Sequence, residues 1–140
     1  MQTYWETIIT PNTLELHPER YHRSLEYCIN NNINIKELIN KKIYNTWYSN
    51  HLLCLSYLVG DLEHIPNQNE SFYGSNTSIS NELGINILKC LVKLGIDLFS
   101  TNYYGENVFQ VINNNLTINY RINNTEFKSA LENLSRSSSP

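Results

Sequence analysis

Few residues in this chain have the types and spacing that chemistry requires, and His51 with Cys54 comes closest. A histidine three positions from a cysteine on one helix could generate a thiolate nucleophile, as in a small thiol-dependent hydrolase. Leucines occupy positions 52, 53 and 55, however, and an apolar setting raises the pKa of a thiol. We therefore expect no catalytic residue, and a thiol-dependent hydrolase remains the alternative.

Metal and cofactor sites have equally little support in the sequence. His17 and His22 are five positions apart, which does not place them on one helix face as a spacing of four would. The three cysteines, Cys28, Cys54 and Cys90, are odd in number and far apart, so we expect free, buried thiols and no disulfide or zinc site. The chain also lacks the glycine-rich phosphate-binding motifs. We expect no metal and no cofactor.

Charge and composition narrow the choice of partner. The formal net charge is -3 and the ten Lys and Arg residues are scattered, which argues against nucleic-acid binding. No apolar run is long enough to span a membrane, and the first residues do not resemble a signal peptide. We therefore expect an intracellular, cytoplasmic protein. The abundance of Asn, Ile, Lys and Tyr indicates an AT-rich genome, compatible with an amoeba or a large DNA virus that infects one, for which the location would be the host cytoplasm.

The spacing of apolar residues predicts an all-α protein, because no stretch alternates with the period of two that a half-buried strand needs. Helices are expected over residues 18–30, 51–59, 83–94 and 126–134, with another beginning at residue 108 and a helical turn at residues 36–40. Residues 66–81 are polar and aperiodic, which predicts an inserted loop. Residues 135–140 are expected to form a disordered tail, so the single domain covers residues 1–134.

Two aromatic stretches of the chain share one pattern. Residues 46–56, TWYSNHLLCLS, and residues 102–112, NYYGENVFQVI, each begin with a polar residue, continue with two aromatic residues and end in an apolar helix. Their starts lie 56 residues apart. If about 23 residues between Gly60 and Leu83 are an insertion, the period is about 33 residues, the length of an ankyrin repeat.

The second stretch resembles an ankyrin repeat in its turns as well. Residues 95–98, Gly-Ile-Asp-Leu, stand where the family has Gly-Ala-Asp-Val, and residues 102–107, Asn-Tyr-Tyr-Gly-Glu-Asn, stand where it has Asp-x-x-Gly-x-Thr. Thr10-Pro11 is similar to the Thr-Pro that begins a repeat, here in a degenerate first copy. The chain departs from the pattern at Val108 and Gln110, where the family has Pro and His.

The resemblance implies a solenoid of about three pairs of antiparallel helices with short, hairpin-like tips, and an insertion in the middle repeat. Four residues would form its structural turns, namely Gly60, Gly95, Asp97 and Gly105. Such a solenoid leaves a continuous surface for a partner. We therefore expect a non-enzymatic protein–protein interaction module.

Aromatic residues are the candidates for binding a protein partner, because exposed Trp and Tyr are typical of binding hot spots. They are Trp47, Tyr48, Tyr103 and Tyr104 at the expected tips, and Phe72 and Tyr73 in the inserted loop. In the alternative interpretation, one member of each tip pair packs inward between repeats and Phe72 and Tyr73 fix the loop to the body. An irregular helical bundle that forms a homo-oligomer is a further alternative.

Overall fold

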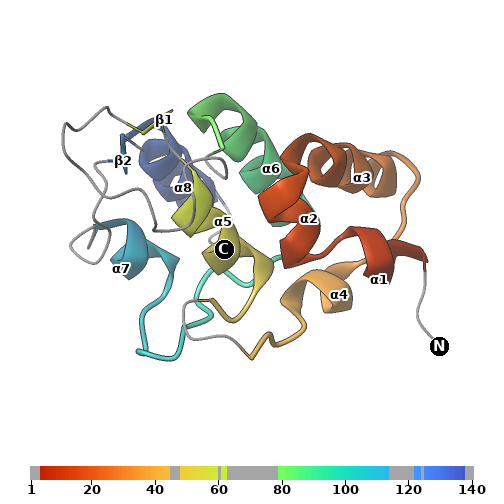
Figure 1. Ribbon diagram of the computed structural model, residues 1–140, viewed down its shortest axis with the longest axis horizontal. Helices are drawn as coiled ribbons and strands as arrows, with labels where there is room; N and C mark the ends of the chain where they lie inside the picture. The colour runs from red at the N-terminus through yellow and green to blue at the C-terminus, as the bar shows by residue number, and fades with distance from the viewer. Residues whose placement is uncertain are drawn as a thin grey trace.

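The computed structural model of the protein describes residues 4–44, 48–59, 61–62, 79–113, 122–123 and 125–137. Within these residues, helices predominate (Figure 1). The elements in chain order are α1 (Tyr4–Ile8), α2 (Pro11–Leu16), α3 (Pro18–Asn30), α4 (Lys36–Asn40), α5 (His51–Leu58), β1 (Asp61–Leu62), α6 (Asn81–Lys93), α7 (Val108–Asn113), β2 (Ile122–Asn123) and α8 (Thr125–Ser137). The strands β1 and β2 are only two residues long and pair antiparallel. The predicted all-α class is confirmed.

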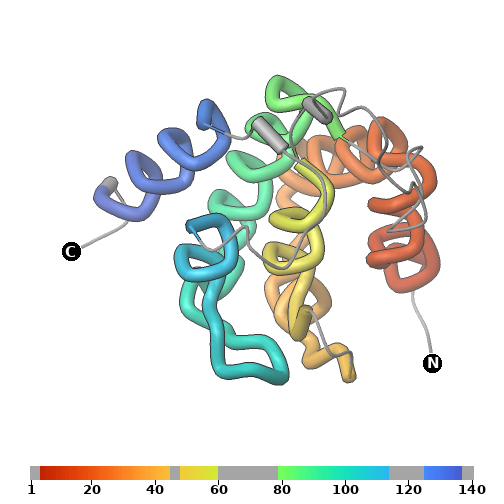
Figure 2. Tube along the Cα trace, turned by 60° about the vertical axis from the view of Figure 1, so that its left-hand side comes forward, coloured from red at the N-terminus to blue at the C-terminus, as the bar shows by residue number. Residues whose placement is uncertain are grey.

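Three helices of equal length form one layer of the structure. Helices α3, α6 and α8 have 13 residues each and lie side by side, with α6 in the middle (Figure 2). Each of them is amphipathic: α3, for example, buries Tyr21, Leu25 and Cys28, which recur at helical spacing on one face. The apolar faces of the three helices point into a common core.

The second layer contains the shorter helices α2, α5 and α7, in which α5 contacts both α2 and α7. Helix α5 has no polar face, because every residue from His51 to Leu58 is buried. A helix that is apolar on all sides must be covered on all sides, and its neighbours in both layers provide that cover. The central position of α5 thus explains why its sequence is apolar apart from His51 and Ser56.

The helices of the second layer begin at the same kind of N-cap, a side-chain oxygen that accepts a bond from the backbone N–H three residues later. These bonds run from Thr13 N to Thr10 Oγ1 (3.1 Å), from Leu53 N to Asn50 Oδ1 (3.0 Å) and from Gln110 N to Asn107 Oδ1 (3.1 Å). Gln110 Oε1 accepts a reciprocal bond from Asn107 N at 2.9 Å, which completes a capping box.

Helices α3 and α6 end in the same turn. Ile33 N donates to Cys28 O at 2.8 Å, and Ile96 N donates to Leu91 O at 3.0 Å. The residue before each donor, Asn32 or Gly95, has a left-handed backbone with φ of 54° or 94°. This is the geometry of a Schellman motif. The two ends lie 63 residues apart in the chain and repeat one another.

The boundaries of three predicted helices differ from the structure, and α5 differs least, because it ends at Leu58, one residue before the predicted end. Helix α6 begins at Asn81, two residues earlier than predicted, because Ser80 Oγ accepts a bond from Leu83 N at 3.2 Å and caps the helix. Helix α8 runs to Ser137 instead of ending at residue 134. The prediction of a disordered tail from residue 135 is therefore wrong for its first three residues. Apolar periodicity also missed the short helices α1 and α2.

Several predicted features lie outside the described residues. They are Gly60, Trp47, Phe72, Tyr73 and residues 66–78 of the inserted loop. The last residues of that loop, 79–81, are described and belong to the body: Ile79 is buried and forms a β-bridge with Val59. None of the described helices has both the length and the apolar character needed to cross a bilayer.

The packing of α6 against Val59 yields the first prediction. A Cβ atom added at Gly84 would lie 2.7 Å from Cγ2 of Val59, a stiff, buried side chain that cannot move aside. We expect Gly84→Ala to lower the free energy of unfolding by about 1–3 kcal/mol, measured by urea denaturation.

The matched control is the double variant Gly84→Ala/Val59→Ala, in which the clash is absent. The cost of Gly84→Ala should largely vanish in the Val59→Ala background. An equal cost in both backgrounds would contradict this account of the contact.

Candidate functional site

Two loops project from one edge of the helical layers (Figures 1 and 2). The first tip joins α4 to α5, and its described residues are 41–44 and 48–49; the second tip, residues 99–107, precedes α7. A backbone hydrogen bond closes each tip, from Ile43 N to Ser49 O and from Asn102 N to Glu106 O, both at 2.9 Å. Gly105, predicted as a turn residue, has a φ of 76° at the bend of the second tip.

The tips expose aromatic side chains. Of the seven large hydrophobic side chains that are exposed in the described residues, four lie here, and we call them the tip surface: Tyr44, Phe99, Tyr103 and Tyr104. Tyr44 is 90% exposed and Tyr103 is 79% exposed. The rings of Tyr103 and Tyr104 meet edge to face with centroids 5.4 Å apart, while Phe99 stacks on Phe109 at 5.9 Å. Grouped exposed apolar side chains of this kind mark contact sites.

A hollow of about 560 Å³ separates the two tips. Residues of both tips line it, namely Lys42, Ile43, Tyr44, Ser49, Thr101, Asn102 and Tyr103. The Lys42 ammonium group lies 5.5 Å from the centroid of the Tyr44 ring, a cation–π contact. The hollow thus combines aromatic walls with polar groups, and it is large enough to receive a side chain of a partner.

Asn102 holds the second tip in shape. Its Oδ1 atom accepts bonds from the backbone N–H groups of Tyr104 (2.9 Å) and Glu106 (3.0 Å). Its Nδ2 atom donates to the Tyr57 hydroxyl at 3.3 Å, which connects the tip to α5. Because Asn102 is buried and its bonds fix the backbone on both sides of the exposed tyrosines, their positions are set before any partner binds.

Asparagine side chains also connect the first tip to the turn that leads into the second. Asn40 Oδ1 accepts a bond from Asp97 N at 2.7 Å, and Asn40 Nδ2 donates to Gly95 O at 2.9 Å. Asn50 Nδ2 donates to Asp97 O at 3.1 Å. The Asp97 carboxylate accepts a bond from Phe99 N at 2.9 Å, as expected for its turn role. The two tips therefore form one unit.

The predicted binding residues that the structure describes differ in their exposure to solvent. Tyr103 and Tyr104 are exposed at the second tip. Tyr48 is half-buried against the core, and its hydroxyl group lies 3.5 Å from Glu15 Oε1. Burial, followed by the nearby Cys54 and Glu15, raises the pKa of Tyr48 to about 12. At the first tip, then, Tyr48 points inward, as the alternative interpretation of the pairs has it.

Sequence reasoning did not single out Tyr44 and Phe99, which belong to the same surface. Tyr44 begins the aromatic patch YNTWYSN, in which only the pair Trp47-Tyr48 aligns with the second copy of the pattern. Phe99 follows the turn at residues 95–98 and falls outside the apolar period of any helix. A large apolar residue that fits no helical period is a sign of such an exposed residue, and Tyr44 and Phe99 both have this property.

The candidate thiol pair, His51 and Cys54, is buried in α5. His51 Nδ1 lies 2.6 Å from the Tyr21 hydroxyl, so the imidazole is hydrogen-bonded to α3. Burial lowers the pKa of His51 to about 4, and burial raises the pKa of the Cys54 thiol far above its usual range. Both groups are neutral near pH 7, and the thiolate that nucleophilic attack requires is not formed.

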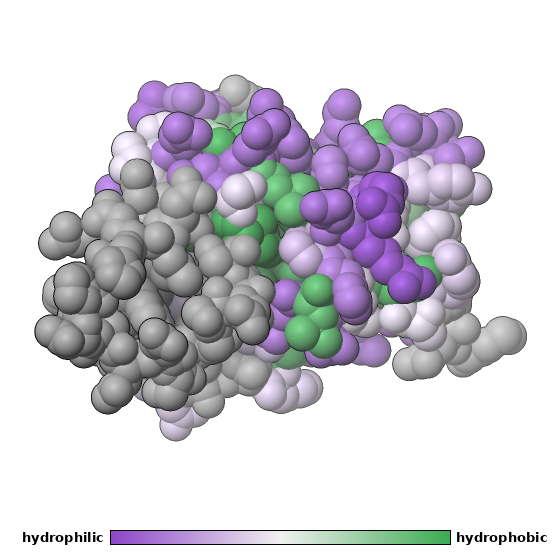
Figure 3. Space-filling model, turned by 45° about the horizontal axis from the view of Figure 1, so that its top comes forward, coloured by the Kyte–Doolittle hydropathy of each residue, from purple (hydrophilic) through white to green (hydrophobic). Residues whose placement is uncertain are grey.

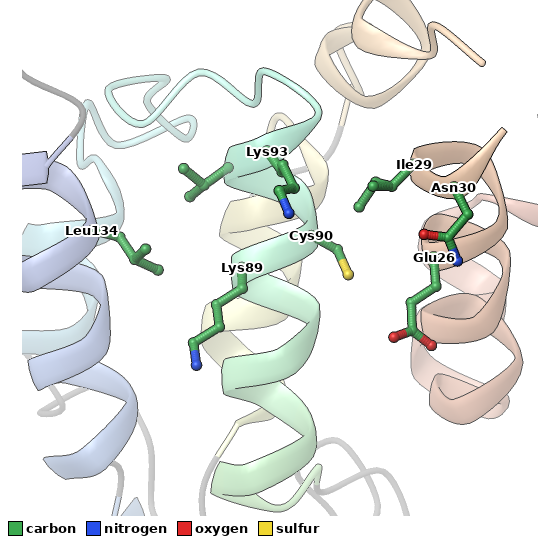
Figure 4. Close-up of a pocket in the computed structure, with 8 residues that line it drawn as sticks. Glu26, Ile29, Asn30, Lys89, Cys90, Lys93 and Leu134 are labelled. Carbon is green, nitrogen blue, oxygen red and sulfur yellow. The ribbon is translucent and has the colours of Figure 1, made fainter. Parts of the chain in front are cut away.

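A second cysteine faces a hollow of about 420 Å³ in the layer of long helices (Figure 4). The sulfur of Cys90 points from α6 toward α3, where Glu26 and Ile29 line the opposite wall. Burial, with a further contribution from Glu26, raises the pKa of Cys90 to about 11. This thiol is also protonated near pH 7. All three cysteines are free and buried, which confirms the prediction.

The remaining surface of the described residues gives little further indication of a function. On the face shown in Figure 3, hydrophilic residues dominate the described surface and hydrophobic residues appear in small patches between them. No three His, Cys, Asp or Glu side chains within the described ranges are grouped so that they could hold a metal ion.

Comparisons of the chain with family models, with curated proteins and with solved structures find no match. The function of the tips is therefore inferred from their geometry.

The bonds of Asn40 give a prediction about the attachment of the tips. Asn40→Ala leaves the N–H of Asp97 and the carbonyl of Gly95 without their side-chain partner, so we expect unfolding to become easier by about 1–3 kcal/mol. Urea denaturation measures the change. Asn12→Ala is the control, since Asn12 is exposed in α2 and should cost no more than about 0.5 kcal/mol. Equal stability of the two variants would contradict the role of Asn40.

Burial of His51 gives a prediction about pH. The folded state resists protonation down to a pKa of about 4, whereas the unfolded chain takes up the proton near 6.5. The neutral imidazole is compatible with folding above pH 6.5, and stability is lost as the pH falls from 6.5 to 4. The loss should amount to roughly 3 kcal/mol.

The variant His51→Asn keeps a hydrogen-bonding group beside the Tyr21 hydroxyl but does not titrate in this range. Its free energy of unfolding should change less than that of the wild type between pH 6.5 and 4, measured with urea at each pH. His17→Asn removes an exposed histidine and should keep the wild-type slope. Identical slopes for the wild type and His51→Asn would refute the assignment.

Proposed function

We propose that this chain is a non-enzymatic protein–protein interaction module that binds its partner with the tip surface. The observation that carries the proposal is the exposure of Tyr44, Phe99, Tyr103 and Tyr104 on two tips that side-chain hydrogen bonds join into one unit. A protein partner fits this surface because aromatic side chains bury a large area at a small entropic cost.

The fixed geometry of the tips supports the proposal. A flexible loop must be ordered when it binds, and the ordering subtracts from affinity. Here Asn102 already fixes the backbone around Tyr103 and Tyr104, and the Ser49 and Ser100 hydroxyls, 2.8 Å apart, connect the two tips directly. The hollow between the tips then offers a preformed site for one anchoring side chain of the partner.

An ankyrin-like solenoid is the architecture we propose for the module. Its support is the alternation of the helices between two layers along the chain, in which α2 packs against α3 and α5 packs against α6, and α7 is followed by α8. Helices α3, α6 and α8 stack on one another in order, as successive repeats of a solenoid do. The matching turns after α3 and α6 and the matching caps before α2, α5 and α7 add to this support.

The alternative of a homo-oligomer gains no support from the last helix. A solenoid that extended by stacking end to end would present an apolar face there. The exposed positions of α8 instead carry polar side chains, namely Thr125, Glu126, Ser129, Asn133 and Arg136. This polar face resembles the capping face that ends a repeat array in solution.

The test compares proteins captured by the wild-type chain with those captured by Tyr103→Ser/Tyr104→Ser. The double variant removes two exposed rings, so it should keep the wild-type circular dichroism spectrum while losing partner capture at least tenfold, measured by quantitative mass spectrometry after chemical cross-linking.

Leu16→Ser provides the matched control, because it removes an exposed apolar side chain in α2, outside both tips. It should capture the same proteins in the same amounts as the wild type. If the double tyrosine variant also captures them in unchanged amounts, the tip surface does not bind a partner and the proposal fails.

A further inference from the structure

Helix α1 packs against α3 on the side of the structure where the chain begins (Figure 1). These two helices carry a second group of exposed aromatic side chains. The ring of Trp5 contacts the ring of Tyr4 edge to face at 4.9 Å and the ring of Tyr27 at 5.4 Å. Trp5 packs against the core, whereas Tyr4 and Tyr27 are more than half exposed. The three rings form a continuous aromatic wall at the N-terminal end of the stacked helices.

Two arginines complete a hollow beside this wall. Its volume is about 610 Å³, and we call it the N-terminal hollow; it is lined by Tyr4, Trp5, Arg20, Arg23, Ser24 and Tyr27. No acidic residue is among these six. Within the described part of the chain, the side chains of Arg20 and Arg23 have no ion-pair or hydrogen-bond partner. The lining of this hollow therefore carries two guanidinium groups and no acidic group, although the protein as a whole has a net charge of -3.

We propose that the N-terminal hollow binds an acidic segment of a protein partner in which carboxylates flank an aromatic side chain. Guanidinium groups bind carboxylates in a bidentate fashion, and both arginines have all their donors available. The aromatic wall would pack against the aromatic side chain of the segment and exclude water from the ion pairs, which strengthens them. This site is separate from the tip surface and does not depend on the proposed function of the tips.

The placement of the positive charges favours carboxylates on neighbouring side chains over a single phosphate group. Arg20 and Arg23 are three positions apart on α3, so their Cα atoms are separated by about 4.5 Å along the helix axis. Among the polar groups of the hollow, the Ser24 hydroxyl already donates its proton to the carbonyl of Arg20 at 2.9 Å. This serine hydroxyl therefore has no proton left to donate to the oxygens of a phosphate group between the two arginines.

The test uses the full chain with Trp47→Phe, which leaves Trp5 as its only tryptophan and makes fluorescence a local reporter of the hollow. The probe is the synthetic peptide GDEYEG, titrated at low salt. We expect saturable binding that weakens as salt is added. The peptide GNQYQG, in which amides replace the carboxylates, should bind at least tenfold more weakly.

Substitutions then assign the site. Arg20→Gln/Arg23→Gln should weaken binding of GDEYEG at least tenfold, whereas Arg136→Gln, which removes an exposed arginine of α8, should not change it. Tyr103→Ser/Tyr104→Ser should also leave it unchanged, since the tips are a separate surface. All these positions are exposed, and circular dichroism verifies folding.

Four results would overturn the proposal. They are the absence of a fluorescence change, equal affinity for the carboxylate and amide peptides, binding that survives loss of both arginines, and tighter binding of GNQYQG carrying phosphotyrosine than of GDEYEG. The last result would assign the hollow to a phosphorylated partner instead.

Discussion

The carboxamide of Asn40 supplies partners to a turn that lies 55 to 57 residues later in the chain. Residues 95–97 leave α6 without continuing into another helix or strand, so the backbone groups that the Schellman motif does not satisfy take partners from elsewhere. Asn40 accepts from one of these groups and donates to another, and Asn50 donates to a third. Two loops far apart in sequence thereby become one rigid edge, and the arrangement of the tip surface depends on this contact.

The core determines where that edge can form. Helix α5 is buried along its whole length, so its neighbours must cover every side of it and only its ends can lead to the surface. At its N-terminal end, Asn50 caps the helix with one side-chain atom and reaches the turn with the other. The residue that begins the most buried helix is therefore also one that connects the tips. Asn50 thus contributes both to the start of the buried helix α5 and to the geometry of the tips.

Residue type and period predicted much of the fold, but few of its long-range contacts. The start of α3 at Pro18, its end in an asparagine run and the burial of the cysteines all follow from local signals. Codon usage accounts for the abundance of asparagine but does not single out Asn40, Asn50 and Asn102, whose hydrogen-bond partners are brought near only by the fold. The spacing of apolar residues does not predict the exposure of Tyr44 and Phe99 either, because both lie in loops, where buried and exposed positions do not recur at a regular spacing.

The two proposed binding surfaces differ in chemistry and in place. The tip surface is aromatic and bordered by neutral polar groups and Lys42, whereas the N-terminal hollow pairs aromatic rings with two free guanidinium groups. The N-terminal hollow is formed by α1 and α3, whereas the tips adjoin α4, α5 and α7, so the two surfaces belong to different elements. Two segments of one partner could then bind together, and the second would bind at the effective concentration set by the first. Even weak contacts at each surface would add up to a stable complex, without any change in the fold of the chain.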